Sequence, residues 1–430
     1  MSPERVGCLV VGGGPGGIEA ATWFARSGRP TMLVERDGLG GACLHVGCIP
    51  AKLLLDRAHR HGDGDAGVAW KEFRRDLSAT VARHERGAAA TLRRAGVEVV
   101  HGEARPHPAG VAVTTTTTTG GDERVVLPDH LVLATGSRPC PAPFPVNGDA
   151  VLTSDDIFTL EAPPASLVVI GGGAVGAELA DAFCGLGTAV TLVEAAPQLL
   201  PGEDTDLAGS LADALAARGV SIHLGVAVGG VDSGSDGRSV RLADGRVLTA
   251  EAVLLAVGRQ PNAADWPLPP ETRIHEIGDR AGGGFAHQAS AMGQAAASAA
   301  PGASPPAIGA VARCVYTSPA VAAVGLTAVE AAAAGINAVE GRAPWSANPM
   351  ADIAGLGGLT KVVAERATGR LLGVHIVGDG APELAALAAA LVDFEAGIHD
   401  ATWLVFPHPT LSETVRAAVL DAHRQLDGNW

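Results

Sequence analysis

Cysteine is scarce in this chain, which has six cysteines among 430 residues, at positions 8, 43, 48, 140, 184 and 314. So few cysteines exclude a secreted scaffold held together by disulfides. Cys8 and Cys184 lie in apolar stretches, where a buried thiol without chemical function is expected. Only Cys43 and Cys48 are close together in sequence, so this pair alone indicates chemistry.

Long apolar segments are also missing. The segment 285–312, which lies within the longest stretch without a charged residue, consists mostly of Ala, Ser, Gly and Pro, and it is too weakly apolar to span a bilayer. The N-terminus lacks the basic start and apolar core of a secretory signal. We therefore expect a cytoplasmic protein with no membrane segment.

Positive charge is in short supply, since the formal net charge is -15 at pH 7. An acidic chain repels nucleic acid and anionic membranes, so small molecules or other proteins are the expected partners. Lysine occurs only at Lys52, Lys71 and Lys361, because nearly all basic residues are arginine. A lysine that is kept within a motif is therefore informative. The length predicts about three domains.

The strongest pattern that is present is an internal repeat. In the first copy a predicted strand at 6–11 leads into glycines at 12, 14 and 17, a helix over 18–27 and a second strand at 31–34 that ends at Glu35. In the second copy a strand at 167–170 leads into glycines at 171, 173 and 176, a helix over 177–186 and a strand at 189–193 that ends at Glu194. In both copies the acid lies 23 residues after the first glycine.

Each copy has the parts of a dinucleotide-binding site. The glycines allow a tight turn and close approach of the backbone, the helix N-terminus faces a pyrophosphate, and the acid binds ribose hydroxyls. A carboxylate at Glu194 repels a 2′-phosphate, and residues 195–197 offer no arginine, so the second site is expected to prefer NAD over NADP.

The region between the copies is expected to be helical over 52–95 and to form β structure over 97–133. The threonine run at 114–119 suits an exposed strand, and we interpret it as part of a surface hairpin. Proline-rich stretches at 139–145, 163–164, 267–270 and 301–306 mark expected crossings between domains.

Cys43 and Cys48 are five residues apart, at the predicted start of the helix that contains Lys52. This spacing lets the two sulfurs meet, and a helix N-terminus stabilises a thiolate. A structural disulfide is disfavoured in a cytosolic chain. Half of a metal site is disfavoured because the second cysteine group is absent, so no metal is expected.

Eight segments together resemble a known family. They read VVGGGPGG at 10–17, GGACLHVGCIPAK at 40–52, LATGSRP at 133–139, VVIGGGAVGAELA at 168–180, AVGRQPN at 256–262, IGDRAGGGFAHQA at 277–289, VYTSPAVAAVGLT at 315–327 and HPTLSE at 408–413. The chain resembles the pyridine nucleotide-disulfide oxidoreductases over nearly its whole length, and within them it is most similar to the dihydrolipoamide dehydrogenases.

The resemblance implies an α/β fold with an FAD domain at 1–150, completed by about 275–312, an NAD domain at 151–274 and a C-terminal α+β dimerisation domain at 313–430. It also implies electron transfer between a small, lipoamide-like dithiol or disulfide and NAD by way of FAD. Cys48 would contact the flavin and Cys43 would exchange with substrate, while Lys52 would pair with Glu178 beside the flavin.

His408 would act as the acid/base and Glu413 would orient it, and a homodimer would lend this pair to its partner's cysteines. The residues expected to bind FAD or NAD are Gly12, Gly14, Pro15, Gly16, Gly17, Glu35, Arg36, Gly41, Ala42, Lys52, Ala104, Ala134, Thr135, Gly136, Asp279, Ala286, Gly171, Gly173, Val175, Gly176, Glu194 and Gly258.

The sequence departs from the family pattern at three places. His45 replaces the usual asparagine, Phe406 replaces a second histidine of the lipoamide enzymes, and the segment 261–277 is short. The first two flank the disulfide site, so an enzyme for another small disulfide is an alternative. A flavoprotein without disulfide turnover is a second alternative, since a fold does not fix a function.

Overall fold

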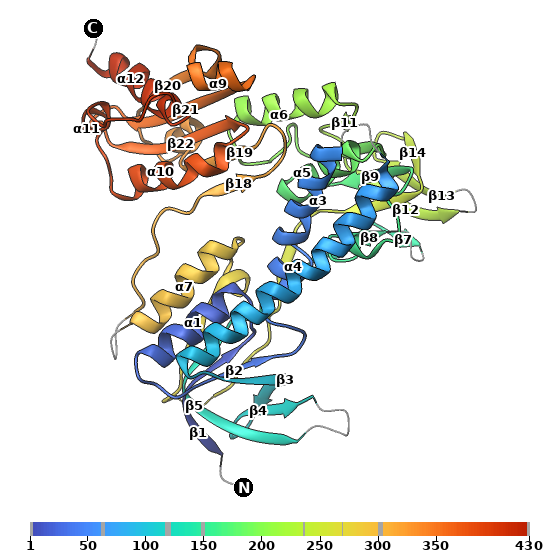
Figure 1. The fold of residues 1–430 in the computed structure, drawn as a ribbon, viewed down its shortest axis with the longest axis vertical. Coiled ribbons are helices and arrows are strands. Elements are labelled where there is room, and N and C mark those ends of the chain that lie inside the picture. The colour runs from blue at the N-terminus through green and yellow to red at the C-terminus, as the bar shows by residue number, and fades with distance from the viewer. Residues whose placement is uncertain are drawn as a thin grey trace. The chain divides into compact units, whose positions relative to one another are not determined.

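The computed structural model describes residues 3–61, 65–116, 122–147, 151–234, 237–268, 270–299 and 304–427. The chain forms two compact units (Figure 1). The first unit contains Met1–Leu53, Lys71–Pro141 and Gly258–Ile308, and the second contains Leu54–Trp70, Ala142–Val257 and Gly309–Trp430.

The first unit is built on a parallel sheet in the order β3-β2-β1-β5-β17, formed by β1 (Glu4–Val11), β2 (Thr31–Glu35), β3 (Glu98–His107), β5 (Glu123–Leu133) and β17 (Arg273–Glu276). Strand β4 (Gly110–Thr115) pairs in antiparallel fashion with the C-terminal half of β3 and with the N-terminal end of β5. The β4–β5 pairing forms the expected hairpin, although threonines 117–119 lie outside the described residues.

Alternate residues of β1 face different cores, as expected for a strand buried on both faces. Cys8 and Val10 face the helices α1 (Pro15–Arg26), α4 (Ala66–Ala95) and α7 (Ala286–Ser298). Leu9 and Val11 face β4 and Trp266, which closes the opposite side. The short segment after residue 261 therefore completes the core of the first unit.

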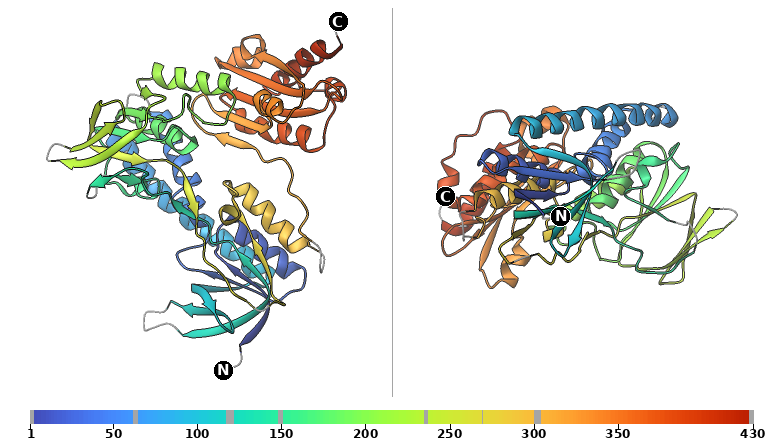
Figure 2. Two further views of the ribbon diagram at one scale, coloured as in Figure 1. Left: turned by 180° about the vertical axis from the view of Figure 1, so that it is seen from behind. Right: turned by 90° about the horizontal axis from the view of Figure 1, so that it is seen from below.

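Helices α1 and α7 lie side by side over this sheet (Figure 2). Small residues make the close contact possible: a Cβ on Gly16 would lie 2.9 Å from the carbonyl oxygen of Ala289, and one on Gly293 would lie 2.5 Å from that of Gly16. The two helices thus pack backbone against backbone.

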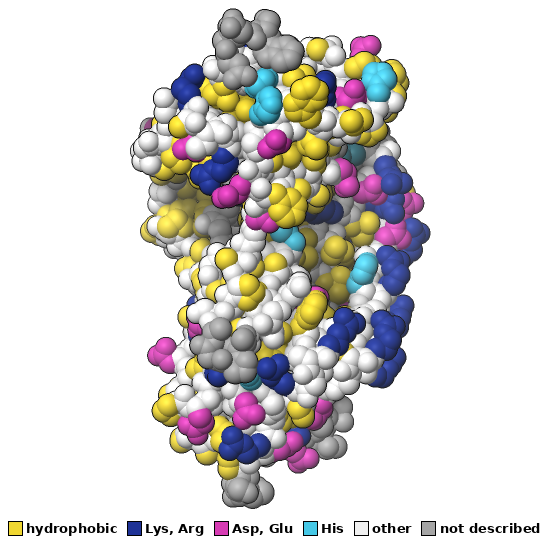
Figure 3. All heavy atoms as spheres, turned by 90° about the vertical axis from the view of Figure 1, so that its left-hand side faces the viewer, with side chains coloured by type: hydrophobic (Ala, Val, Ile, Leu, Met, Phe, Trp, Pro, Cys, Tyr) yellow, Lys and Arg dark blue, Asp and Glu magenta, His cyan; other side chains and the backbone are white. Residues whose placement is uncertain are grey.

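Helix α4 gives this acidic chain a local basic surface. Dark-blue side chains gather along one edge of the face drawn in Figure 3, over this helix. Its exposed basic residues are Lys71, Arg74, Arg75, Arg83, Arg86, Arg93 and Arg94.

The second unit contains a parallel sheet in the order β11-β10-β9-β15-β8, formed by β8 (Leu152–Thr153), β9 (Ser166–Ile170), β10 (Ala189–Val193), β11 (Ser221–His223) and β15 (Ala252–Leu255). Helices α5 (Ala174–Gly185) and α6 (Thr205–Ala217) follow β9 and β10. A smaller sheet, β14-β13-β12-β7, adds β7 (Val146–Asn147), β12 (Val228–Gly234), β13 (Gly237–Leu242) and β14 (Val247–Ala250).

The C-terminal part of the second unit is an antiparallel sheet in the order β18-β19-β22-β21-β20, formed by β18 (Arg313–Val315), β19 (Val321–Gly325), β20 (Ala338–Pro344), β21 (Gly358–Glu365) and β22 (Leu371–Gly378). Its main core lies against α10 (Ala381–Asp393) and α12 (Glu413–Asp427), with α9 (Pro349–Ala354) and α11 (Ile398–Thr402) at the margins. Helix α8 (Ala328–Ala333) packs on a separate small core.

The expected fold class is confirmed: two dinucleotide-binding folds precede a C-terminal α+β domain. Both repeat helices start three residues earlier than predicted, at Pro15 and Ala174, because Gly14 and Gly173 serve as N-caps and the later glycines lie inside the first turn. The helical region after the cysteines is two helices, α3 (Cys48–His61) and α4.

Candidate active site

The first glycine turn lies between β1 and α1, and its geometry requires glycine. Gly12 has φ +103°, and a Cβ there would lie 2.3 Å from the carbonyl oxygen of Ala134. A Cβ on Gly17 would lie 1.9 Å from the carbonyl oxygen of Gly12. Gly14 would meet nothing nearer than the Cα of Gly41 at 3.9 Å, so the start of α1 is open to a pyrophosphate.

Glu35 lies at the end of β2, beside this turn. Its carboxylate accepts hydrogen bonds from the backbone N–H groups of Gly13 and, at 2.8 Å, Asp37. This places the acid where it can accept hydrogen bonds from a ribose diol, as in other folds of this kind. Arg36 points elsewhere, because its guanidinium pairs with Asp37 at 3.1 Å and Glu103 at 3.6 Å. The turn and the acid fit a dinucleotide such as FAD.

Three of the sequence motifs, at 133–139, 256–262 and 277–289, meet at the carboxyl end of this sheet. Ser137 donates a hydrogen bond to Asp279 in the 3₁₀ helix η2 (Gly278–Ala281), and Arg259 donates to the Ser137 hydroxyl at 2.9 Å. Thr135 and Asn262 exchange two hydrogen bonds of 3.0 and 2.9 Å. These contacts accompany the pairing of β6 (Ser137–Pro139) with β16 (Arg259–Pro261).

Ser137, Arg259 and Asn262 were not among the predicted cofactor residues. They lie within the motifs at 133–139 and 256–262, so the motifs themselves were the available signal. The other predicted residues of this region lie in the same unit: Ala104 is in β3, Ala134 and Gly136 follow β5, Gly258 precedes β16, and Ala286 begins α7.

Both cysteines were expected at the start of the helix that contains Lys52, but only Cys48 lies there, and Cys43 lies in a separate short helix. Cys43 lies in α2 (Gly41–His45), which also contains Ala42, and Cys48 is the first residue of α3. The thiol of Cys43 hydrogen-bonds with Cys48; this contact and burial raise the pKa of Cys43, while the charge of Lys52 lowers it. A helix N-terminus stabilises a thiolate at Cys48.

His45 lies between the cysteines and makes two contacts that sequence reasoning did not predict. Its Nε2 lies 3.2 Å from the carbonyl oxygen of Leu39 and 3.5 Å from a carboxylate oxygen of Glu85 on α4. The ring therefore joins the cysteine helix to the loop after β2 and to α4.

Glu178 is buried on α5, with 4% of its surface exposed. Its carboxylate accepts a hydrogen bond of 2.9 Å from the backbone N–H of Tyr316, and Asp181, one turn later, accepts one of 2.8 Å from Ser318. The C-terminal domain thus holds this face of α5. The expected pairing of Glu178 with Lys52 stays a prediction.

His408 and Glu413 form the expected pair in the second unit. The Nδ1 of His408 lies 3.1 and 3.2 Å from the two carboxylate oxygens of Glu413. The N–H of Thr410 donates to Glu413 at 3.0 Å, and this bond, followed by the contact with His408, lowers the pKa of the carboxyl group. The imidazole side chain is 68% exposed, whereas Phe406 packs against the C-terminal core.

The second glycine turn reproduces the first. Gly171 has φ +109°, and a Cβ there would lie 2.4 Å from the carbonyl oxygen of Ala256. A Cβ on Gly176 would lie 1.8 Å from the carbonyl oxygen of Gly171, whereas one on Gly173 would meet nothing within 4 Å. Glu194 accepts hydrogen bonds from the N–H groups of Gly172 at 2.6 Å and residue 196 at 2.7 Å. This turn fits a second dinucleotide.

Among the residues that the structure describes, no helix combines the length and apolar character needed to cross a membrane. Within the same residues, no three His, Cys, Asp or Glu side chains gather as a metal site would require.

Two family models match the chain. The model for pyridine nucleotide-disulphide oxidoreductase matches residues 7–271, and that for the dimerisation domain of the same proteins matches residues 311–419. The dihydrolipoyl dehydrogenase of Chlorobaculum tepidum is 35% identical, over 96% of both chains. That of Pseudomonas aeruginosa is 34% identical, over 97% of both chains.

Solved structures agree with these matches. LpdA from Mycobacterium tuberculosis has a TM-score of 0.84 and 27% identity, and the alignment covers 96% of this chain and 99% of that one. The HOCl-induced flavoprotein disulfide reductase RclA from Escherichia coli has a TM-score of 0.84 at 23% identity, over 96% of this chain and 99% of that one, and it shares the fold.

Proposed function

Because the chain belongs to the pyridine nucleotide-disulphide oxidoreductase family, whose members use FAD and NAD(H), we propose that it oxidises dihydrolipoamide with NAD through Cys43 and Cys48. The observation that carries the proposal is the hydrogen bond between Cys43 in α2 and Cys48 at the start of α3, with the charge of Lys52 acting on Cys43. Relatives that match along nearly their full length are named dihydrolipoyl dehydrogenase.

The thiol chemistry assigns a task to each side chain. The reaction starts from the oxidised protein, in which Cys43 and Cys48 are joined by a disulfide bond instead of the hydrogen bond seen between the free thiols. His408 takes a proton from the substrate dithiol, and the resulting thiolate attacks Cys43, so that the disulfide bond breaks and Cys48 leaves as a thiolate. The second substrate thiol then displaces Cys43, which takes up that thiol's proton, and a cyclic disulfide is released. When bound, FAD supplies an acceptor that passes the electron pair on to NAD. Glu413 holds the imidazole in place through Nδ1.

FAD would be held by the first glycine turn, Glu35, Lys52 and Asp279, and NAD by the second turn and Glu194. We assign the FAD domain to 1–150 with its completion at about 275–312, the NAD domain to 151–274 and the dimerisation domain to 313–430. A cytoplasmic location belongs to the same proposal, and the small number of cysteines supports it.

We propose that the active form is a homodimer in which His408 of one copy serves the cysteines of the other. Large apolar side chains near this histidine support a contact with a second chain: Trp403 is 75% exposed and Val405 is 97% exposed. Such side chains are commonly covered at interfaces. The match to a dimerisation-domain model supports the same arrangement.

An anaerobic titration of the FAD-loaded protein with dihydrolipoamide, followed by NAD, tests the proposal. We expect a long-wavelength thiolate-to-flavin absorption band that disappears when NAD is added and NADH forms. Cys48→Ser should abolish the band, and Cys184→Ser, which removes a thiol remote in sequence, should keep it. If neither dihydrolipoamide nor NADH produces the band, the catalytic proposal is wrong.

A second candidate is an enzyme of the same mechanism that acts on another small disulfide. The contact of His45 with Glu85 favours it, because an ionisable pair has been introduced beside the exchanging cysteine. If NADH produces the band and dihydrolipoamide does not, this candidate replaces the first.

A further inference from the structure

In each repeat the loop that follows the acid contacts the glycine next to the first motif glycine, which is Gly13 in the first repeat and Gly172 in the second. In the second repeat the N–H of Leu200 donates to the carbonyl oxygen of Gly172 at 2.8 Å, and the side chain of Leu199 lies 2.7 Å from where a Cβ of Gly172 would be. In the first repeat Gly40 and Leu39 make the same two contacts with Gly13, at 2.8 and 2.9 Å. The loop is therefore part of each nucleotide site.

The two loops differ at the residue that makes the hydrogen bond. Gly40 has φ +109° and Leu200 has φ +47°, so both adopt left-handed backbone conformations. Glycine does this without strain, whereas leucine does not, and such strain persists only where the surroundings hold the backbone. The second loop therefore needs support that the first does not.

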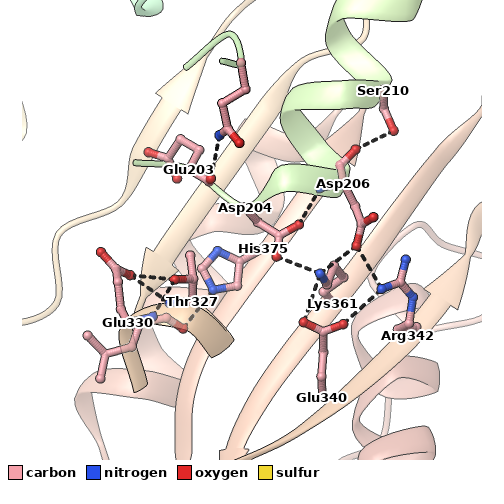
Figure 4. A network of polar contacts seen from close by, with 12 residues as sticks. Glu203, Asp204, Asp206, Ser210, Thr327, Glu330, Glu340, Arg342, Lys361 and His375 are labelled. Carbon is pink, nitrogen blue, oxygen red and sulfur yellow. Dashed lines mark hydrogen bonds and ion pairs between the residues drawn. The ribbon is translucent and has the colours of Figure 1, made fainter. Parts of the chain in front are cut away.

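The residues that follow Leu200 supply this support, and Figure 4 shows the contact of Asp204 with Lys361. Glu203 forms a bidentate pair with Arg313 on β18, with distances of 2.6 and 3.0 Å. Asp204, the N-cap of α6, accepts a hydrogen bond of 2.6 Å from Lys361 on β21. These four residues form what we term the β21 clamp, which ties the loop to the C-terminal sheet.

Lysine is required at position 361 by the shape of the site. Its side chain is 3% exposed, and its ammonium lies 2.6, 2.8 and 2.9 Å from carboxylate oxygens of Asp204, Asp206 and Glu340. Burial lowers its pKa, but the three carboxylate bonds outweigh burial and raise it. An ammonium donates three bonds in a tripod, which a planar guanidinium does not do, and the chain uses arginine at nearly every other basic position.

We propose that the β21 clamp positions residues 195–204 for dinucleotide binding, so that Lys361 in the C-terminal domain controls the affinity of the second site for NAD. This inference rests on the proposed binding of NAD at that site. Lys361 acts through the loop and is a positioning residue, because it contacts the loop's end and not the glycine turn.

Calorimetric titration of the FAD-loaded protein with NAD tests the clamp. Lys361→Met should weaken NAD binding about five-fold or more, within the usual range for coupling between sites. Lys361→Arg should not restore the affinity, and the matched control Lys71→Met, which removes an exposed lysine on α4, should leave it unchanged. The dithiol-induced flavin band should persist in all three variants.

Arg313→Gln provides a second test if Lys361→Met fails to fold, because Arg313 is less buried, at 31% exposure, and holds the residue next to Asp204. Weaker NAD binding with FAD and the dithiol-induced band retained supports the clamp. NAD affinity within about two-fold of the unmodified protein, or loss of FAD together with NAD, overturns it. If the unmodified protein itself binds no NAD, the proposed function fails first.

Discussion

The two glycine turns have the same backbone and different surroundings. In each turn a Cβ on the third motif glycine, Gly17 or Gly176, would lie within 2 Å of the carbonyl oxygen of the first. In each, the acid also accepts a hydrogen bond from the backbone N–H of the glycine after the first, Gly13 or Gly172. The residue before that third glycine differs: Gly16 is buried under α7, whereas Val175 is 42% exposed. A covered helix suits a cofactor that stays bound, and an open one suits a nucleotide that exchanges.

The largest expected effect comes from substitutions that disrupt one glycine turn and leave the other intact. Gly17→Ala should abolish FAD retention, because its Cβ would lie 1.9 Å from a carbonyl oxygen. Gly176→Ala, with 1.8 Å in the second turn, should keep FAD and the dithiol-induced band but lower NADH formation about 100-fold. Absorption spectra and steady-state assays distinguish them; loss of FAD in both variants would show that the turns are not independent.

The β21 clamp supports the second turn only, and its removal should cost stability. Lys361→Met leaves the buried carboxylate of Asp204 without its cation, whereas Asp206 and Glu340 keep Arg342. The free energy of unfolding should fall by about 3–5 kcal/mol. Adding Asp204→Asn should recover part of this, because asparagine removes a charge and still caps a helix. Urea unfolding measures both, and a loss below about 1 kcal/mol would contradict the role of a buried pair.

Exchanging the residues before the third glycines tests why the helices differ. Gly16→Val forces side-chain atoms toward Ala289, 2.9 Å from a new Cβ, and should cost about 1–3 kcal/mol or more. Val175→Gly should cost only about 0.5–1 kcal/mol, through the lower helix propensity of glycine. Thermal unfolding gives both values. Equal losses would mean that α7 does not explain the difference.

The smallest effect concerns a histidine pair at the edge of the first sheet. His275 lies 3.0 Å from His130, and burial, the charge of His130 and that of Arg273 lower the pKa of His275 to about 4. The pKa of His130 is lowered by burial, Arg29 and Arg273, and Asp129 opposes this.

Because His275 has an unfolded pKa of about 6.5, the unfolded chain binds more protons between pH 6.5 and 4. Stability should therefore fall as the pH decreases through that range. His275→Gln should reduce the fall in melting temperature, and His84→Gln, at an exposed position of α4, should not. Identical pH profiles for both variants would exclude the pair as the cause.

The sequence predicted the features that depend on local sterics. The repeat strands agree with β1, β2, β9 and β10 to within about two residues, because glycine turns and apolar runs act over short distances. The pairing of His408 with Glu413 was predicted from a motif six residues long.

Other features could not be predicted because they join distant parts of the chain. The sequence shows that lysine is rare and therefore draws attention to Lys361. Its partner Asp204, however, lies 157 residues earlier, in the loop between β10 and α6. The left-handed Leu200 carries no sequence signal, since the residue type opposes the conformation. The contact of His45 with Glu85 depends on how α4 returns past the cysteines.

The packing of α7 on α1 bears on the order in which the chain becomes structured. The first unit is discontinuous, and α7, which buries the face of α1, is made only after residues 142–257 of the second unit. During synthesis the first glycine turn must therefore wait, with its helix uncovered, until residues 286–298 leave the ribosome. An interrupted chain would expose this small-residue face, and chaperones or proteases would encounter it before the cofactor does.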